Sequence, residues 1–112
     1  MIIKKEEVVS LGIVLKTHPY KESDSLVTVY FKDYGKMTLI ARGVKKLKSK
    51  NASACQSLTL SEFTFIPRNG LSTMIKASSV DFYRYIKENL ELEAYASYFM
   101  EFILKNEEDN QP

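Results

Sequence analysis

The sequence is poor in the residues that build disulfides and metal sites. Its 112 residues include one cysteine, Cys55, one histidine, His18, and no tryptophan. A lone cysteine has no partner for an internal disulfide, and one cysteine with one histidine falls short of a zinc ligand set. We therefore expect no metal and no cofactor, and we interpret Cys55 as a small buried apolar residue.

Long apolar runs and catalytic signatures are also missing. No stretch approaches the roughly 18 apolar residues of a membrane-spanning helix, and Met1-Ile2-Ile3-Lys4-Lys5-Glu6-Glu7 lacks the apolar segment of a signal peptide. The glycines form no phosphate-binding fingerprint, and His18 lies beside Pro19 without catalytic partners. We therefore expect a cytoplasmic protein that is not an enzyme and has no membrane partner.

Positive charge is concentrated in one segment of the chain. Five of the 16 basic residues fall in the run Ala41-Arg42-Gly43-Val44-Lys45-Lys46-Leu47-Lys48-Ser49-Lys50, which contains no acidic residue. Without these five, 11 basic and 14 acidic residues remain, so the net charge of +2 conceals a local cationic cluster. Lys and Arg side chains placed against phosphates release condensed counterions, which makes the run a candidate polyanion site. An isolated lysine run is equally typical of a solvated loop.

Alternating apolar residues predict a mainly β protein with five strands. The predicted strands cover residues 8–16, 25–31, 36–42, 58–66 and 71–83. Turn formers predict a loop over residues 17–24 and hairpin loops at Lys32-Asp33-Tyr34-Gly35 and Pro67-Arg68-Asn69-Gly70. Residues 44–57 are expected to form a short helix or an ordered loop. This order of elements is that of a five-stranded OB-fold barrel, which we assign to residues 1–83.

After Tyr83 the apolar period becomes that of a helix. One amphipathic stripe consists of Leu92, Tyr95, Ala96, Phe99, Phe102 and Ile103. Because a stripe this aromatic needs a cover, we expect residues 84–112 to hold the first helix or helices of a truncated helical domain. The stripe also offers a route to self-association through Tyr95, Phe99 and Phe102.

The nucleic-acid-binding face of such barrels comprises strands two and three and the loops that join strands one to two and four to five. If Met37, Leu39 and Ala41 point inward, the third strand presents Lys36, Thr38 and Arg42 outward. The predicted phosphate contacts are Arg42, Lys45, Lys46, Lys48 and Lys50, followed by Lys16, Lys36 and Arg68. Tyr20 and Tyr34 are candidates for stacking on bases, and burial of either ring in the core stays an open alternative.

A series of short motifs runs along the chain. They are Gly12-Ile13-Val14-Leu15-Lys16-Thr17, Tyr20, Glu22-Ser23-Asp24, Tyr34-Gly35-Lys36 and Ala41-Arg42-Gly43-Val44-Lys45-Lys46, followed by Tyr95-Ala96 and Glu101. Together they resemble the N-terminal region of the RecO family of bacterial DNA repair and recombination mediators. Their order and spacing carry the resemblance, because each motif alone is short. The sequence departs from the family pattern at Leu47, Cys55 and Ser57.

The resemblance implies an OB domain that leads into a helical domain. It also implies a nucleoid-associated protein that binds single- and double-stranded DNA and anneals complementary strands coated by single-strand-binding protein. With RecR, such a protein helps to load the RecA recombinase, and it needs no nucleotide hydrolysis. Two alternatives remain open: an OB module that serves mainly as a docking surface for RecR, and an OB domain that binds RNA.

Overall fold

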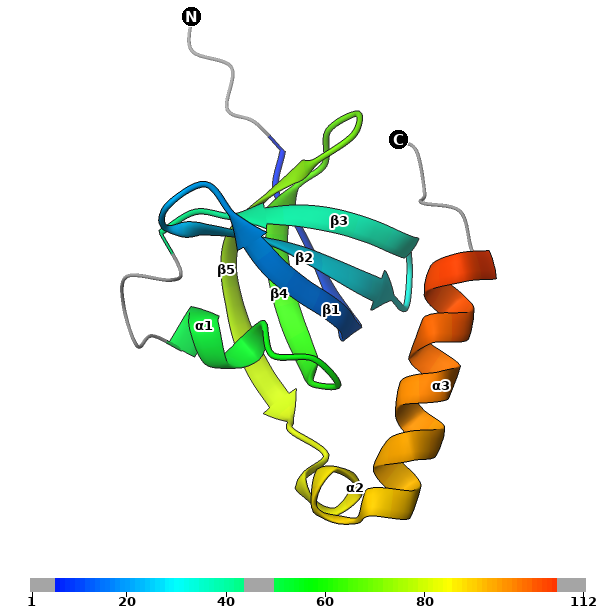
Figure 1. The fold of residues 1–112 in the computed structure, drawn as a ribbon. Helices are drawn as coiled ribbons and strands as arrows, with labels where there is room; N and C mark the ends of the chain where they lie inside the picture. The colour runs from blue at the N-terminus through cyan, green and yellow to red at the C-terminus, as the bar shows by residue number, and fades with distance from the viewer. Residues whose placement is uncertain (1–5, 44–49, 107–112) are drawn as a thin grey trace, which may run out of the picture.

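The computed structural model describes residues 6–43 and 50–106. In chain order its elements are β1 (Val8–Tyr20), β2 (Asp24–Phe31), β3 (Gly35–Ala41), α1 (Lys50–Ala54), β4 (Leu60–Ile66), β5 (Ser72–Asp81), α2 (Arg84–Glu88) and α3 (Leu90–Asn106). The strands form a closed barrel in the order β1-β2-β3-β5-β4, with α3 alongside (Figure 1). The predicted five-stranded barrel followed by a helical segment is therefore confirmed.

β1 closes the barrel because it pairs with a different neighbour along each part of its length. Residues 8–13 pair antiparallel with β4, and residues 12–20 pair antiparallel with β2. The register with β2 shifts between Val14 and Lys16, so Leu15 forms a bulge that bends the strand. Gly12 pairs with both neighbours, and a Cβ added there would lie 2.4 Å from Cγ1 of Val29.

The prediction of a loop over residues 17–24 was wrong. β1 continues to Tyr20, and the turn before β2 comprises only residues 21–23, where Lys21 takes a φ of 58°. Pro19 had favoured a loop. It is tolerated in the strand because β4 pairs only with residues 8–13, so Pro19 has a ladder partner, Ser25, on one side only.

The barrel interior holds one apolar cluster built from alternating strand positions. The ring of Phe31 stacks on Phe65 at 4.8 Å between centroids and meets Phe63 nearly edge-on at 5.6 Å. Such aromatic pairs add to the stabilisation that burial already supplies. The inward orientation predicted for β3 is confirmed. The other buried members from the strands are Val14, Val27, Val29, Met37, Leu39, Ala41, Met74 and Ala77.

The short helix α1 closes one end of the barrel (Figure 1). Ala54 is fully buried and belongs to the core cluster, as does Cys55. The side-chain oxygen of Asn51 accepts a hydrogen bond from the backbone N–H of Ala77 at 3.0 Å, and Ser61 Oγ donates to the carbonyl of Ala54 at 2.8 Å. The predicted short helix and the predicted burial of Cys55 are both confirmed.

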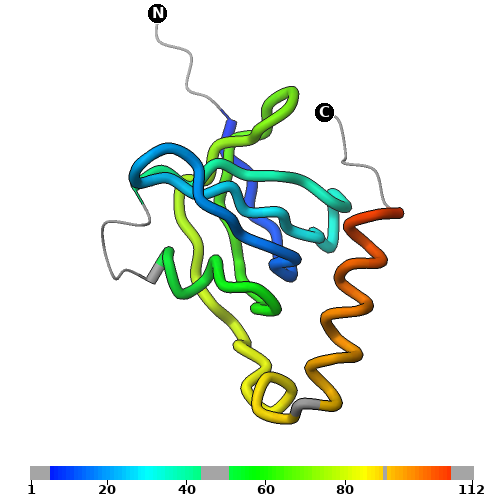
Figure 2. Tube along the Cα trace, in the orientation of Figure 1, coloured from blue at the N-terminus to red at the C-terminus, as the bar shows by residue number. Residues whose placement is uncertain are grey.

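The chain leaves β5 through α2 and runs back beside the barrel as α3 (Figure 2). Over residues 6–43 and 50–106, hydrogen bonds from lysine side chains join this helical part to the barrel. Lys36 Nζ donates to the carbonyl of Leu104 at 3.2 Å, and Lys87 Nζ donates to Thr59 Oγ1 at 3.3 Å. The predicted helix is confirmed, and its aromatic stripe is largely exposed.

Gly12 provides a test of this closure. We expect Gly12→Ala to lower the free energy of unfolding by about 2 kcal/mol or more, because the new methyl group would overlap Val29 and Phe31. Chemical denaturation measures the loss. In a Val29→Ala background the same substitution should cost at least about 0.5 kcal/mol less, because the nearest overlapping atom is gone. An equal cost in both backgrounds would contradict the steric explanation.

Candidate nucleic-acid interface

Strand register defines the outward surface of β1, β2 and β3. Val29 and Phe31 are fully buried in the barrel, so Thr28 and Tyr30, which alternate with them, lie on the other side of β2, where Tyr30 is exposed and Thr28 is covered by its neighbours at 5% exposure. Residues directly opposite one another in antiparallel strands share a face. The cross-strand pairs of Thr28 and Tyr30 therefore identify the rest of this surface.

Three cross-strand rows lie on this surface away from α3. In the first, Thr28 lies between Lys16 and Thr38, and the two threonine hydroxyls are 3.4 Å apart. In the second, Leu26 lies between His18 on β1 and Ile40 on β3. The parallel pairing of Ile40 with Thr73 extends this row to β5. The third row begins at Tyr20, opposite Asp24. We call this surface the outer face and define it by Lys16, His18, Tyr20, Leu26, Thr28, Thr38, Ile40 and Thr73.

Arg68 reaches the outer face from the loop between β4 and β5. Its Nε donates to Thr73 Oγ1 at 3.1 Å, and its backbone N–H donates to Ser72 Oγ at 3.1 Å. Thr73 pairs with Ile40 across the β3–β5 junction. Barrel closure thus brings Arg68 to the face that carries Lys16.

Arg42 follows β3 directly and is exposed at the edge of this face. The next residue, Gly43, has a φ of 71° and donates its N–H to Asp24 Oδ1 at 2.8 Å. Asp24 is the cross-strand partner of Tyr20, so this bond ties the start of the basic segment to the end of β1. Of the predicted phosphate contacts, Lys45, Lys46 and Lys48 lie outside the described residues, and Lys50 is described only by its backbone, as the first residue of α1.

Two other predicted site residues lie at the opposite end of the β2–β3 hairpin. Lys36 donates to Leu104 at the end of α3, so this cation already has a protein partner. The ring of Tyr34 meets Phe31 and Phe65 nearly edge-on, at 6.4 Å and 5.7 Å between centroids. Tyr34 thus packs against the barrel core, which is the alternative to base stacking that the sequence left open for it. By contrast, Tyr20 lies on the outer face, half-buried, with Lys21 Nζ 5.3 Å from its ring centroid.

Sequence reasoning missed Thr28 and Thr73 as members of this face. The alternation of buried Val27 and Val29 along β2 would have identified Thr28, because the residue between two inward positions points outward. Thr73 had no such signal, since its place beside Ile40 exists only once β3 meets β5 in the closed barrel.

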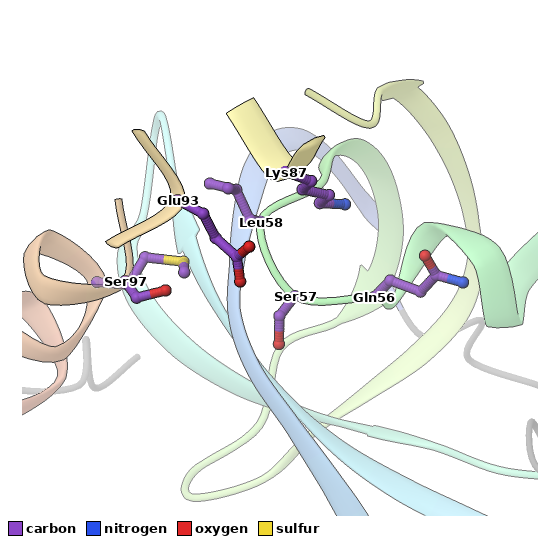
Figure 3. A pocket seen from close by; sticks show the side chains of 7 residues that line it. Gln56, Ser57, Leu58, Lys87, Glu93 and Ser97 are labelled. Carbon is purple, nitrogen blue, oxygen red and sulfur yellow. The ribbon is translucent and has the colours of Figure 1, made fainter. Parts of the chain in front are cut away.

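Cavities lie between α3 and the barrel in the described part of the chain. The first, of about 450 Å³, is almost wholly apolar and includes Leu15, Tyr30 and Phe99. The second, of about 390 Å³, is more polar and lies between α3 and residues 56–58 (Figure 3). Within it, burial lowers the pKa of Lys87, and the charge of Asp81 partly opposes that shift. The lining of this cavity includes Ser57 and Ser97 but no histidine that could act as a base for either hydroxyl. The lining consists of Gln56, Ser57, Leu58, Lys87, Glu93, Ser97 and Met100.

Neither a metal centre nor a membrane span is found in the described part of the chain. Over residues 6–43 and 50–106, no three His, Cys, Asp or Glu side chains group closely enough to hold a metal ion. None of the helices in these ranges has the length and apolarity that a bilayer crossing requires. The candidate site is the outer face with Lys16 on it, together with Arg42 and Arg68 at its border.

Comparison with known proteins gives a consistent match across the barrel. The family model described as recombination protein O, N-terminal, matches residues 5–83. This range contains all five strands and every predicted nucleic-acid contact.

Curated relatives extend the similarity into α3. DNA repair protein RecO of Listeria monocytogenes serotype 4a is 38% identical over 101 residues, which are 90% of this chain and 40% of that protein. The protein of the same name from Listeria innocua serovar 6a gives the same values. DNA repair protein RecO of Bacillus cytotoxicus is 36% identical over 100 residues, 89% of this chain and 40% of its own length. The chain thus spans about 40% of the length of these relatives.

Cys55 provides a test of the closed end of the barrel. Burial raises the pKa of its thiol from 9.0 to about 12, so near pH 8 the thiolate population falls about a thousandfold. We expect iodoacetamide to label native protein at least that much more slowly than protein unfolded in urea. Stability should be unaffected below pH 9.0 and should fall as the pH rises toward 12, because the unfolded thiol ionises first. Rapid labelling of folded protein would contradict the burial of Cys55 beneath α1.

Proposed function

Because the chain belongs to the RecO family, we propose that it acts in DNA repair and recombination as a DNA-binding module. In this proposal the outer face binds single- and double-stranded DNA through its cations. The family match over residues 5–83 and the names of the curated relatives support the repair role. The chain spans about 40% of those relatives, so the wider activity is inferred for the protein of which this barrel is a part.

The observation that carries the proposal is the convergence of cations from three parts of the chain on one face. Lys16 comes from β1, Arg42 follows β3, and Arg68 comes from the β4–β5 loop. Asp24 lies at the edge of this face, but its carboxylate accepts the Gly43 N–H. A cationic surface on a barrel of this kind binds a nucleic-acid backbone by neutralising phosphates and releasing counterions.

The roles of individual residues follow from their positions. Tyr20 lies on the open part of the outer face and is the better placed of the two tyrosines to stack on a base. Phosphate contacts position a strand without reading its sequence, so we expect affinity and salt dependence but no sequence preference. The proposed phosphate contacts are Arg42, Lys45, Lys46, Lys48 and Lys50, with Lys16 and Arg68 as a second set. Lys36 would join that second set only by giving up its hydrogen bond to Leu104.

Such a surface is suited to strand annealing. Two complementary strands repel one another through their phosphates, and a cationic protein reduces that repulsion while contacts blind to sequence allow the register to be searched. We propose that residues 1–83 form this DNA-binding domain and that residues 84–112 begin a helical domain. We also propose RecR and single-strand-binding protein as partners, recombinase loading as the outcome, and no catalytic step in the process.

The basic segment is tested by replacing Lys45, Lys46 and Lys48 with glutamate. We expect the triple variant to lose detectable binding to a fluorescent single-stranded oligonucleotide at moderate salt, because three phosphate contacts become three repulsions. At low salt, any residual binding should show a salt slope smaller by about 2. Circular dichroism should report an unchanged fold. Unchanged affinity at low salt would contradict this site.

The outer face is tested separately by the double variant Lys16→Glu/Arg68→Glu. We expect weaker binding to single strands and a salt slope smaller by about 1.4, because two phosphate contacts are removed. The matched control is Lys76→Glu/Arg84→Glu, which makes the same change in net charge at exposed residues of β5 and α2. If both double variants lose the same affinity, net charge alone explains binding and the outer face has no special role.

The two alternative functions make different predictions in the same assays. An RNA-binding module would prefer an RNA strand over a DNA strand of matched sequence, whereas we expect no preference for RNA. A module that serves mainly for docking would retain RecR at moderate salt after nuclease treatment, and the glutamate variants would leave that binding unchanged. Strong salt dependence with DNA alone favours the nucleic-acid function.

A further inference from the structure

One acidic side chain lies among the groups proposed to contact DNA. Asp24 begins β2 and is the cross-strand partner of Tyr20 on β1. On the other side of β2, Ser25 pairs with Ala41 of β3. The next residues beyond this pair are Asp24 and Arg42, which places Asp24 between Tyr20 and Arg42 in register. By charge alone, a carboxylate in this position would repel the phosphates that Arg42 attracts.

The carboxylate of Asp24 is engaged with the backbone that follows β3. Its Oδ1 accepts a hydrogen bond from the N–H of Gly43 at 2.8 Å. Gly43 has a φ of 71°, in the left-handed region that favours glycine. A hydrogen bond to a charged acceptor is stronger than one between neutral groups. The bond therefore fixes the peptide group that joins Arg42 to Gly43, and with it the direction in which the chain leaves β3.

Strand pairing alone does not hold Arg42 in place. β3 ends at Ala41, and its register with β2 ends at the pair of Ser25 and Ala41. Arg42 itself is exposed. Because the bond from Gly43 to Asp24 begins where the strand ladder stops, Arg42 is held between the last strand pair on one side and this bond on the other.

We propose that Asp24 is a positioning residue for DNA binding, which keeps Arg42 at the outer face beside Tyr20 by holding the Gly43 N–H. This inference rests on the proposed DNA function. Repulsion between a surface carboxylate and phosphates is screened by water and salt. The hydrogen bond is lost entirely when its acceptor is removed. Removal of this negative charge from a phosphate-binding face therefore weakens binding, which is the reverse of what charge alone predicts.

Asparagine separates the two roles of Asp24, because its side-chain oxygen accepts a hydrogen bond and carries no charge. We expect Asp24→Asn to bind a fluorescent single-stranded oligonucleotide at least as tightly as the wild-type chain. Asp24→Ala should bind about three- to tenfold more weakly, which matches the net contribution of one hydrogen bond. Circular dichroism checks the fold. If Asp24→Ala does not fold, Asp24→Ser makes the same test, because its hydroxyl is one atom closer to the backbone.

Glu22→Ala is the matched control. Glu22 is exposed in the turn two residues before Asp24, and its replacement changes the net charge by the same amount. We expect Glu22→Ala to leave the affinity unchanged or to raise it slightly. Equal changes in Glu22→Ala and Asp24→Ala, in either direction, overturn the proposal. So does an Asp24→Asn variant that binds as weakly as Asp24→Ala, because the acceptor would then be irrelevant.

A double-mutant cycle with Arg42 distinguishes positioning from a general effect on stability. In an Arg42→Ala background, Asp24→Ala should weaken binding by less than about twofold, because the positioned side chain is gone. In the wild-type background, Asp24→Ala should reduce the salt slope by about 0.7, the value for one phosphate contact on a single strand. The same loss of affinity in both backgrounds would show that Asp24 does not act through Arg42.

The same titrations separate this inference from the proposed function. A wild-type chain that binds no oligonucleotide overturns the proposed function, and the role of Asp24 with it. A wild-type chain that binds while Asp24→Ala binds equally well overturns the role of Asp24 only.

Discussion

The closed barrel depends on β1, which pairs with β4 along its first half and with β2 along its second half. β1 pairs with β4 over residues 8–13 and with β2 over residues 12–20, and the parallel pairing of β3 with β5 completes the closed barrel. Two local features allow this. Gly12 brings the backbone close to Val29 and Phe31, and the bulge at Leu15 bends the strand from one neighbour toward the other. The interior is sealed only when both pairings form.

Closure also assembles the candidate interface. β3 meets β5 in a short parallel pairing at Ile40 and Thr73, and Thr73 receives the side chain of Arg68. The bond from Gly43 to Asp24 then fixes the point where the basic segment leaves the barrel. Cations that are far apart in the sequence therefore share one face because of the strand order, and a surface of this kind suits the phosphate backbone of DNA.

The helix α3 borders the outer face at one end and carries a second, aromatic surface of its own. Lys36 lies at the hairpin end and binds the last turn of α3, so a cation that the sequence places with the others is held in an internal contact. Tyr95 and Tyr98 of α3 are exposed to solvent, and Phe99 and Phe102 stay more than half exposed although they line the cavity against the barrel. The same helix thus borders the outer face at one end and carries a largely exposed aromatic stripe.

The spacing of apolar residues and the turn formers were enough to predict the strands, the order of elements and the amphipathic α3, because each depends on neighbours in the chain. They also limited the segment before Cys55 to a short helix or an ordered loop, and the structure has the helix α1 there. The loop predicted around Pro19 failed, because the end of β1 is stabilised by β2 and not by its own residues. The sequence alone also determined the cationic run and the family. Only the tertiary structure decided which cations converge: Arg68 reaches the outer face and Lys36 is drawn to α3, since both positions depend on contacts between segments that meet only after the barrel has closed.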